Sequence, residues 1–305
     1  MSHFQIRTDL ALEAREYVEN ANGKLRGVIV EEYEKEDGEI QVTKVQIVTK
    51  NGSKLIGKPI GAYVTLEIPN LCEIGEDSLF LYKKIVEEIS FHLCNLLPER
   101  KKDFSVLVVG LGNREVTADA LGPLVVDKME VTRHILKEYG ELGMGEKKSI
   151  MVSAIVPGVM AKTGMESAEI VKGIVEETLP DAVIVIDALA ARSVRRLNRT
   201  IQLSNAGIHP GSGVGNHRNA IDSTFLGIPV VAIGVPTVVD AATIVADAME
   251  KMHRKLKEAV FLQARETTVF TELNNMYVTP KDIDSTVEKV SDILAEALNL
   301  SFHKV

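Results

Sequence analysis

Residues 105–109 are SVLVV, and three similar apolar runs follow: IMVSAIV at 150–156, AVIVI at 182–186 and PVVAI at 229–233. Val and Ile dominate these runs, and such β-branched residues favour strands. Short continuous apolar runs bounded by other patterns are typical of strands that are covered on both faces. They predict a sheet buried between two layers of helices.

Helical patterns lie between and after these runs. Apolar residues recur with helical spacing over 121–139, 167–179 and 241–264, and again over 282–298. Strands that alternate with helices predict a mostly parallel sheet, because a parallel connection needs a crossover, usually a helix. We therefore predict a three-layer α/β core over residues 101–305, with its sheet flanked by helices.

The first hundred residues have a different pattern, which predicts a β-rich extension followed by a helix. No linker rich in Pro, Gly or Ser separates this extension from the core, so residues 11–305 should pack as one domain in which 11–100 form the extension. The expected elements are a helix over 9–17, strands over 25–33, 40–48 and 62–68, turns at Asp37-Gly38 and Asn51-Gly52, and a helix over 79–97.

The composition argues against several classes of protein. The chain has a net charge of -8, whereas general nucleic-acid binding needs a concentrated basic face. No apolar run approaches the roughly 20 residues of a membrane span, and the first residues lack the apolar region of a signal peptide. We therefore expect a cytosolic protein that binds neither membranes nor nucleic acid directly.

Acidic side chains follow three of the four buried strands. Asp119 lies in GLGNREVTADALGP (110–123), Asp187 directly follows AVIVI, and Asp240 lies in GVPTVVDAAT (234–243). In an open parallel sheet, ligands bind beyond the carboxyl ends of the strands, so these residues are candidates for a functional site. Capping of a helix N-terminus is the expected role of Asp240 and the alternative role of the other two.

A pair of carboxylates at neighbouring strand ends has a specific chemistry. When two such groups lie close together they share a proton, because both cannot ionise easily. The ionised member can act as a general base on water, and the protonated member can donate to a carbonyl oxygen and later to a leaving amine. Asp119 and Asp187 are therefore candidates for the general acid and base of a hydrolase.

Other motifs are absent or incomplete. The segment GLGN lacks the third glycine of a dinucleotide-binding GxGxxG, and the sequence contains no GxxxxGK[ST], GxSxG or HExxH.

The segment HPGSGVGNH (209–217) combines His209 with Gly211, Gly213 and Gly215, whose backbone N–H groups could bind a substrate anion or an oxyanion. A flexible surface loop is the alternative. His209 and His217 could also bind a metal together with the two aspartates.

Five segments together resemble the germination protease family of spore-forming bacteria. The combination of two of them is specific to that family: one contains GLGN followed by VT.DALGP, and the other contains IDALAARS. The resemblance extends along nearly the whole chain. The segments are RTDLALEARE (7–16), GLGNREVTADALGP (110–123), PGVMAKTGMES (157–167), IDALAARS (186–193) and HPGSGVGNHR (209–218).

This resemblance implies an atypical aspartic peptidase without an Asp-Thr-Gly signature, in which Asp119 and Asp187 are the catalytic pair and no metal or cofactor takes part. It implies a fold similar to that of the hydrogenase maturation proteases, and a homotetramer in the forespore or spore core. The substrates would be the small acid-soluble proteins that coat DNA in dormant spores and are degraded during germination.

The resemblance also implies a zymogen that removes its own N-terminal segment. The sequence Asp9-Leu10-Ala11-Leu12-Glu13 is similar to the cleavage motif of the spore substrates: an acid, an apolar residue, Ala, any residue, then Glu. A cut between Leu10 and Ala11 would follow this pattern and would make residues 1–10 a propeptide. We expect the uncut segment to lie over the active site.

Two alternatives stay open at this point. A metal-dependent peptidase of the hydrogenase-maturation type would use the same loops, but Ala120 follows Asp119 where that type has a second acid nearby. An α/β binding protein would use its acids as helix caps and its glycine-rich loop as a ligand site. A chelator tests the first alternative, and replacement of the two aspartates tests the second.

Overall fold

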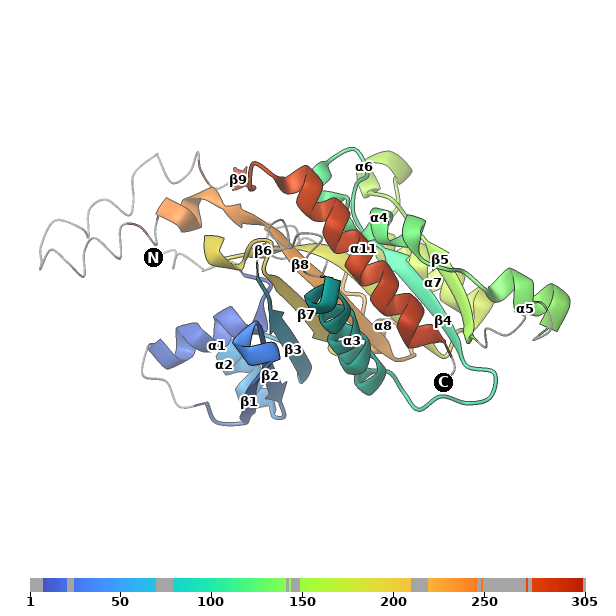
Figure 1. Ribbon diagram of the computed structural model, residues 1–305, viewed down its shortest axis with the longest axis horizontal. Helices are drawn as coiled ribbons and strands as arrows, with labels where there is room; N and C mark the ends of the chain where they lie inside the picture. The colour runs from blue at the N-terminus through green and yellow to red at the C-terminus, as the bar shows by residue number, and fades with distance from the viewer. Residues whose placement is uncertain are drawn as a thin grey trace, which may run out of the picture.

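The computed structural model describes residues 8–20, 25–69, 79–140, 143, 149–209, 219–245, 248, 273 and 276–303. The described strands are β1 (Val28–Lys35), β2 (Ile40–Ile47), β3 (Gly61–Glu67), β4 (Ser105–Gly110), β5 (Met151–Ile155), β6 (Ala182–Ala191), β7 (Thr200–Ser204), β8 (Val230–Asp240) and β9 (Tyr277–Val278). They form one sheet with the order β1-β2-β3-β7-β8-β6-β4-β5, and β9 pairs with β8 (Figure 1).

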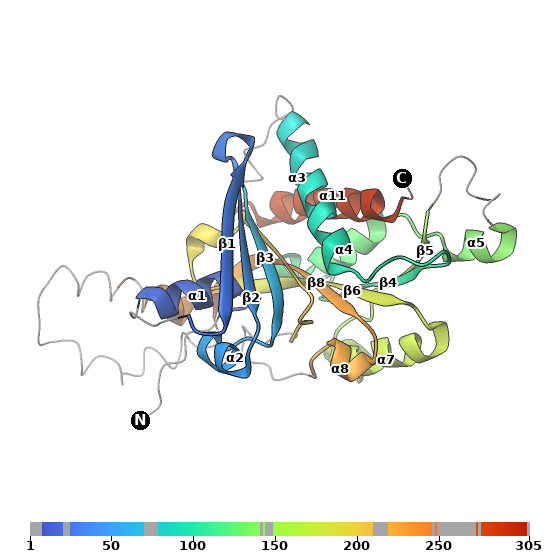
Figure 2. The ribbon, with the colours of Figure 1, turned by 90° about the horizontal axis from the view of Figure 1, so that it is seen from below.

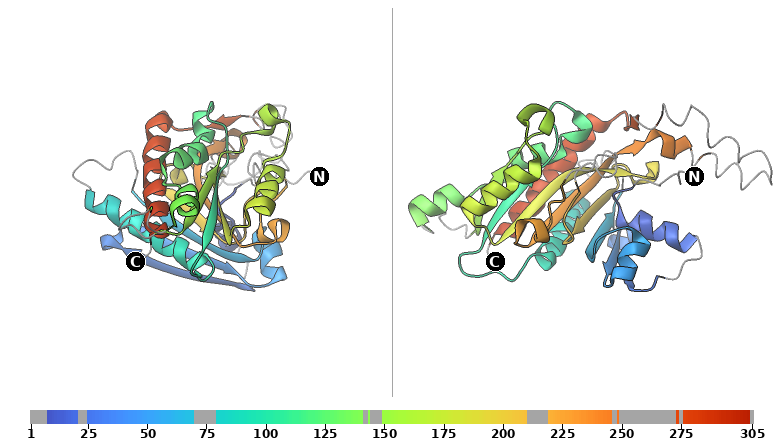
Figure 3. Two further views of the ribbon diagram at one scale, coloured as in Figure 1. Left: turned by 90° about the vertical axis from the view of Figure 1, so that its right-hand side faces the viewer. Right: turned by 180° about the vertical axis from the view of Figure 1, so that it is seen from behind.

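Helices cover both faces of the sheet, which confirms the predicted α/β fold. On one face lie α3 (Leu79–Leu96), α4 (Leu121–Lys128) and α11 (Ile283–Phe302); on the other lie α7 (Ser167–Thr178) and α8 (Ser223–Leu226) (Figures 2 and 3). The remaining described helices are α1 (Ala11–Asn20), α2 (Lys50–Ile56), α5 (Arg133–Tyr139) and α6 (Met160–Thr163). None of the described helices is both long and apolar enough to cross a membrane.

Two apolar clusters fill the space between these layers. The α3 cluster contains buried residues of α3, α4 and α11, and the α7 cluster contains buried residues of α7 and α8. Successive residues of the central strands alternate between the two clusters, as Ile184 and Val185 of β6 do, because side chains of a strand point to opposite faces in turn. The strands β4, β6 and β8 are therefore buried on both faces, as their apolar runs predict, whereas β5 at the edge of the sheet is only partly buried.

Among the described strands, parallel pairing joins β5, β4, β6 and β8, in that order. β7 pairs antiparallel with β8 on one side and with β3 on the other, and β3 continues into the hairpin of β1 and β2. The N-terminal extension is thus continuous with the core sheet. The sequence pattern did not predict β7, whose residues TIQLS provide this connection.

Several element boundaries differ from the predicted ones. β6 and β8 continue beyond Ile186 and Ile233 because they pair with each other as far as Ala191 and Val239. The helix predicted over 121–139 is two helices, α4 and α5. The turn predicted at Asn51-Gly52 lies inside α2, which begins after Thr49, whose side chain accepts a hydrogen bond from the Gly52 N–H at 3.0 Å. Most of the helix predicted over 241–264 lies outside the described residues.

We predict that the extension and the core unfold together. Leu66 of β3 is fully buried in the α3 cluster, so Leu66→Ala should lower the free energy of unfolding by about 2–5 kcal/mol. Denaturant unfolding followed by circular dichroism should show one transition at a lower midpoint. Leu79→Ala is the control, because Leu79 is 59% exposed and should cost much less. A second, unshifted transition in Leu66→Ala would contradict the prediction.

Candidate active site

Asp187 lies inside β6, where β8 pairs with it on one side and β4 has ended one residue earlier on the other. It is 6% exposed, and its register partner in β8 is Gly234. On the other side, the Leu111 N–H just after β4 donates to the Ile186 carbonyl at 2.8 Å. The Asp187 carboxylate accepts a hydrogen bond from the N–H of Ala188 at 2.9 Å. Since no helix begins here, the alternative role of a helix cap is wrong for this residue.

Asp119 ends the 3-10 helix η3 (Thr117–Asp119) in the loop after β4. The Asn113 N–H lies 2.9 Å from its carboxylate and 3.1 Å from its carbonyl oxygen, and donates to both. In addition, the Thr237 hydroxyl of β8 donates to the Ala118 carbonyl at 2.6 Å. These contacts hold the loop against the ends of β4 and β8. No side chain caps α4, so the cap alternative is wrong for Asp119 as well.

Gly112 explains why a glycine-rich segment accompanies this aspartate. Its φ is +116°, in the region that favours glycine. A Cβ at Gly112 would lie 1.9 Å from the Asp119 carbonyl oxygen and 3.2 Å from its Oδ1. The backbone that leaves β4 therefore packs directly against Asp119, one residue after the contact of Leu111 with β6. Both candidate aspartates lie around this turn, at the carboxyl end of β4.

The structure bears differently on the predictions for Asp240, for a metal site and for the loop over 209–217. Asp240 caps the helical residues 241–245 that follow β8, because its Oδ1 accepts hydrogen bonds from the N–H and the hydroxyl of Thr243 at 2.8 and 3.0 Å. This confirms the predicted cap. Among the described residues, no group of three or more His, Cys, Asp or Glu side chains is placed to hold a metal ion. His209 is described and exposed. The residues of its predicted loop that lie outside the described ranges are Gly211, Gly213, Gly215 and His217.

The N-terminal segment is bound to the end of β6. The Asp9 N–H donates to the Ala190 carbonyl, and the Ala190 N–H donates to the Asp9 carboxylate, both at 2.9 Å. Leu10 is fully buried in the α7 cluster together with Leu189. Ala11, which begins α1, belongs to a third cluster with residues of β2 and α2. The peptide bond between Leu10 and Ala11 is therefore enclosed by the fold.

Asp187 and Leu10 lie on the same face of the sheet. Ile184 and Ile186 of β6 belong to the α3 cluster, whereas Val183 and Val185 belong to the α7 cluster. Asp187 is on the same face as Val183 and Val185, because side chains of a strand alternate between the faces. Its side chain is therefore on the face that receives Leu10.

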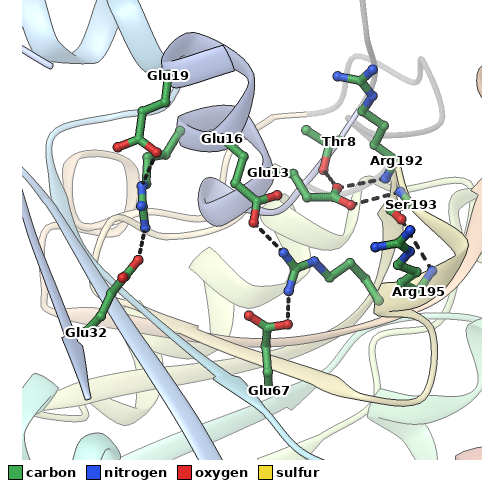
Figure 4. Close-up of polar contacts among 11 residues, drawn as sticks. Thr8, Glu13, Glu16, Glu19, Glu32, Glu67, Arg192, Ser193 and Arg195 are labelled. Atoms are coloured by element: carbon green, nitrogen blue, oxygen red, sulfur yellow. Dashed lines mark hydrogen bonds and ion pairs between the residues drawn. The ribbon is translucent and has the colours of Figure 1, made fainter. Parts of the chain in front are cut away.

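Glu13 anchors the other side of the Leu10–Ala11 bond. Its side chain is buried, and its carboxylate accepts hydrogen bonds from the N–H groups of Arg192 and Ser193, just after β6, at 2.7 and 2.8 Å (Figure 4). The Thr8 hydroxyl donates to the same carboxylate. Burial raises the pKa of Glu13, although these hydrogen bonds and the charge of Arg196 oppose the shift. Residues on both sides of the predicted cut are thus fixed.

Ion pairs add to the attachment of α1. Arg196 contacts Glu16 of α1 at 2.6 Å and also contacts Glu67 of β3. Arg15 contacts Glu19 at 3.1 Å and Glu32 of β1. Such pairs contribute little when solvent reaches them, so the buried contacts of Glu13 matter more for the position of the segment.

A cavity of about 50 Å³ lies beside the segment, and its lining includes Asp9, Lys58, Gln202, His209 and Gly234. Because Gly234 pairs with Asp187 across the sheet, the cavity borders the candidate catalytic strand. His209 is the one residue of the predicted glycine-rich loop that falls within the described residues, and it is part of this lining.

Lys58 brings a cation to the segment. Its Nζ donates to the Thr8 carbonyl at 3.0 Å. Burial lowers the pKa of Lys58, and the nearby charges of Asp9 and Glu13 oppose the shift.

Sequence reasoning missed Lys58 and Gln202 as residues of this site. Lys58 follows α2, and Gln202 lies in β7, so both are far from the two aspartates along the chain. A single Gln inside the short run TIQLS is the one local signal, and it does not reveal which segment it contacts.

We predict that Glu13 stabilises the protein through the two hydrogen bonds that its carboxylate accepts from backbone N–H groups. Glu13→Ala leaves the N–H groups of Arg192 and Ser193 without this acceptor, and an unmade buried hydrogen bond costs about 1–3 kcal/mol. The free energy of unfolding should fall by about that amount in denaturant titrations. Glu19→Ala, on the exposed side of α1, should change it by less than about 0.5 kcal/mol. Equal losses in the two variants would refute this role.

Comparison with known sequences identifies relatives along almost the full length. The sequence model described as "Germination protease" matches residues 6–270. A germination protease of Caldanaerobacter subterraneus subsp. tengcongensis is 47% identical, over 97% of this chain and 94% of the relative. A germination protease of Clostridium perfringens is 43% identical, over 98% and 95% of the two chains.

Among solved structures, the fold is similar to the crystal structure of a [NiFe] hydrogenase maturation protease, HycI, from Thermococcus kodakarensis. The match covers 68% of this chain and 98% of that one, with 14% identity and a TM-score of 0.34. The sequence matches, in contrast, are long and close. They show that this chain belongs to the germination protease family, as its five sequence segments predict.

Proposed function

We propose that this protein is an endopeptidase that degrades small acid-soluble spore proteins during germination, with Asp119 and Asp187 as its general acid and base. Membership in the germination protease family supports a peptidase that acts in germination. One observation carries the finer proposal. The segment Asp9–Glu13, which is similar to the cleavage motif of the spore substrates, is bound on the sheet face to which Asp187 belongs.

In the proposed mechanism the two aspartates share one proton. The ionised carboxylate takes a proton from water as the water oxygen bonds to the scissile carbonyl carbon, and the protonated partner donates to the carbonyl oxygen. The carbon–nitrogen bond then breaks, and a proton passes to the leaving amine. Backbone N–H groups support both acids: that of Asn113 for Asp119 and that of Ala188 for Asp187.

We also propose that the chain is a zymogen that cleaves itself between Leu10 and Ala11. The burial of Leu10 and the pairing of Asp9 with Ala190 support this, because the uncut segment would then occupy the place of a substrate. Removal of residues 1–10 would vacate the Leu10 pocket and the backbone groups of Ala190 for a substrate with a similar sequence. A homotetramer in the spore core, without a metal or cofactor, completes the proposal and rests on the family resemblance.

The catalytic pair is tested with a chain that begins at Ala11 and a purified small acid-soluble spore protein as substrate. Asp119→Asn and Asp187→Asn should each reduce kcat/KM by roughly 10²- to 10⁴-fold, the usual contribution of general acid–base groups. Both variants should keep the wild-type circular dichroism spectrum, and Asp103→Asn, an exposed aspartate, should cleave normally. Cleavage that persists in either site variant would remove that aspartate from the mechanism.

A chelator separates this mechanism from the metal-dependent alternative. Cleavage by the chain that begins at Ala11 should be unchanged after incubation with EDTA, because no step of the proposed mechanism uses a metal. Activity that is lost with EDTA and regained on addition of a divalent metal would favour a peptidase of the hydrogenase-maturation type.

Self-cleavage is tested on the full chain. After incubation, mass spectrometry and N-terminal sequencing should identify one product that begins at Ala11, and Asp187→Asn should prevent its formation. A product that begins at another residue would contradict the proposed cut.

A further inference from the structure

We infer that Gln202 is a positioning residue of the peptidase: its side-chain amide holds the peptide groups on both sides of the apolar residue that precedes the cut. The inference rests on the proposed function, because it takes the Leu10–Ala11 bond as the bond that is cleaved. It assigns a role to a residue of β7, a strand that lies between the fourth and fifth of the sequence segments quoted for the family resemblance.

The contacts of Gln202 define this role. Its Oε1 accepts a hydrogen bond at 2.8 Å from the N–H of Ala11, and that nitrogen belongs to the Leu10–Ala11 peptide itself. Its Nε2 donates to the Asp9 carbonyl at 3.3 Å, the oxygen of the preceding peptide. One planar amide therefore spans Leu10 and contacts the main chain on both sides of it.

The position of Gln202 in the sheet relates it to Asp187. Gln202 of β7 is the register partner of Gly234 in β8, and Gly234 is the register partner of Asp187 in β6. Neighbouring strands lie about 4.8 Å apart, so the Cα atoms of Gln202 and Asp187 are about 10 Å apart. Side chains of register partners are on the same face of a sheet, and both residues therefore face the segment.

Gly234 lies between them in this row and has no side chain. The side chain of Leu189 packs directly over it, because a Cβ at Gly234 would lie 2.4 Å from Cδ1 of Leu189. The cavity beside the segment is lined by both Gln202 and Gly234. The row thus consists of an amide that holds the scissile nitrogen, a glycine over which Leu189 packs, and a candidate catalytic carboxylate.

Burial gives a second reason to assign a function to this side chain. Gln202 is 8% exposed, between the fully buried Ile201 and Leu203, and a buried amide is costly unless its polar atoms are hydrogen-bonded. Within the described part of the chain, its two side-chain hydrogen bonds both go to the segment Asp9–Ala11. The Gln202 amide therefore binds the main chain on both sides of the proposed cut, and cleavage would release the part that contains Asp9.

The contacts predict what Gln202 does and what it does not do. Because both partners are main-chain groups, the amide does not distinguish side chains. It sets which peptide bond lies opposite Asp187. Loss of such positioning should lower the rate and should also make the cut less specific in position. A purely structural amide would affect stability but not the position of the cut.

The test compares Gln202→Met and Gln202→Glu in the full chain. Met has a similar size and removes both hydrogen bonds, whereas Glu keeps the acceptor for the Ala11 N–H. Gln46→Met, at an exposed position of β2, is the control. The measurements are the rate at which the product beginning at Ala11 forms, the start of every other product by mass spectrometry, and the Tm of each variant.

We expect Gln202→Met to slow the cut at Ala11 by roughly 10- to 100-fold, with additional products that begin at neighbouring residues. Gln202→Glu should restore part of the rate, and the control should match the wild type. Cleavage by Gln202→Met at the wild-type rate and position would overturn the inference while leaving the proposed function intact. A wild-type chain that never yields a product beginning at Ala11 would instead overturn the proposed self-cleavage, and the inference with it.

Discussion

The backbone N–H and C=O groups of a buried strand need hydrogen-bond partners. β6 extends beyond the end of β4, one of its two neighbouring strands. β4 ends at Gly110, opposite Ile186, while β6 runs on to Ala191 with β8 alone as its strand partner. The N-terminal segment supplies the missing partners: Asp9 bonds to Ala190, and Glu13 bonds to the two N–H groups that follow β6. The candidate site depends on this constraint, because the place where β4 ends is also where Asp187 lies.

This arrangement links self-cleavage of the chain to the access of a substrate to the candidate site. A cut between Leu10 and Ala11 separates two sets of contacts that the uncut chain makes together. The part before the cut holds Ala190 and fills the Leu10 pocket, and it can leave. The part after the cut stays attached through Glu13 and α1. Self-cleavage would therefore open the space beside Asp187 without removing α1, which packs against β2 and α2.

The sequence predicts those features that depend on local pattern. Apolar runs predict four strands of the core, three of which are buried on both faces, Asp37-Gly38 marks the hairpin, and the position after AVIVI makes Asp187 a candidate site residue. Features that depend on distant partners are not predictable in this way. AVIVI does not reveal that β6 continues to Ala191, since the pairing with β8 decides it. The residues around Gln202 in the sequence do not mark it as part of a site. Its proposed role depends on a contact with a segment almost two hundred residues away.

Amide hydrogen exchange at the end of β6 tests the account most directly. The full chain carrying Asp119→Asn, so that it stays uncut, is compared with the same variant beginning at Ala11. If the N-terminal segment occupies the site, the Ala190 amide is protected in the uncut chain and exchanges much faster in the shorter one, because it loses Asp9. The amides of Arg192 and Ser193 should stay protected in both, because Glu13 remains. Equal protection of Ala190 in the two chains would show that the segment does not occupy the site, and would contradict the account.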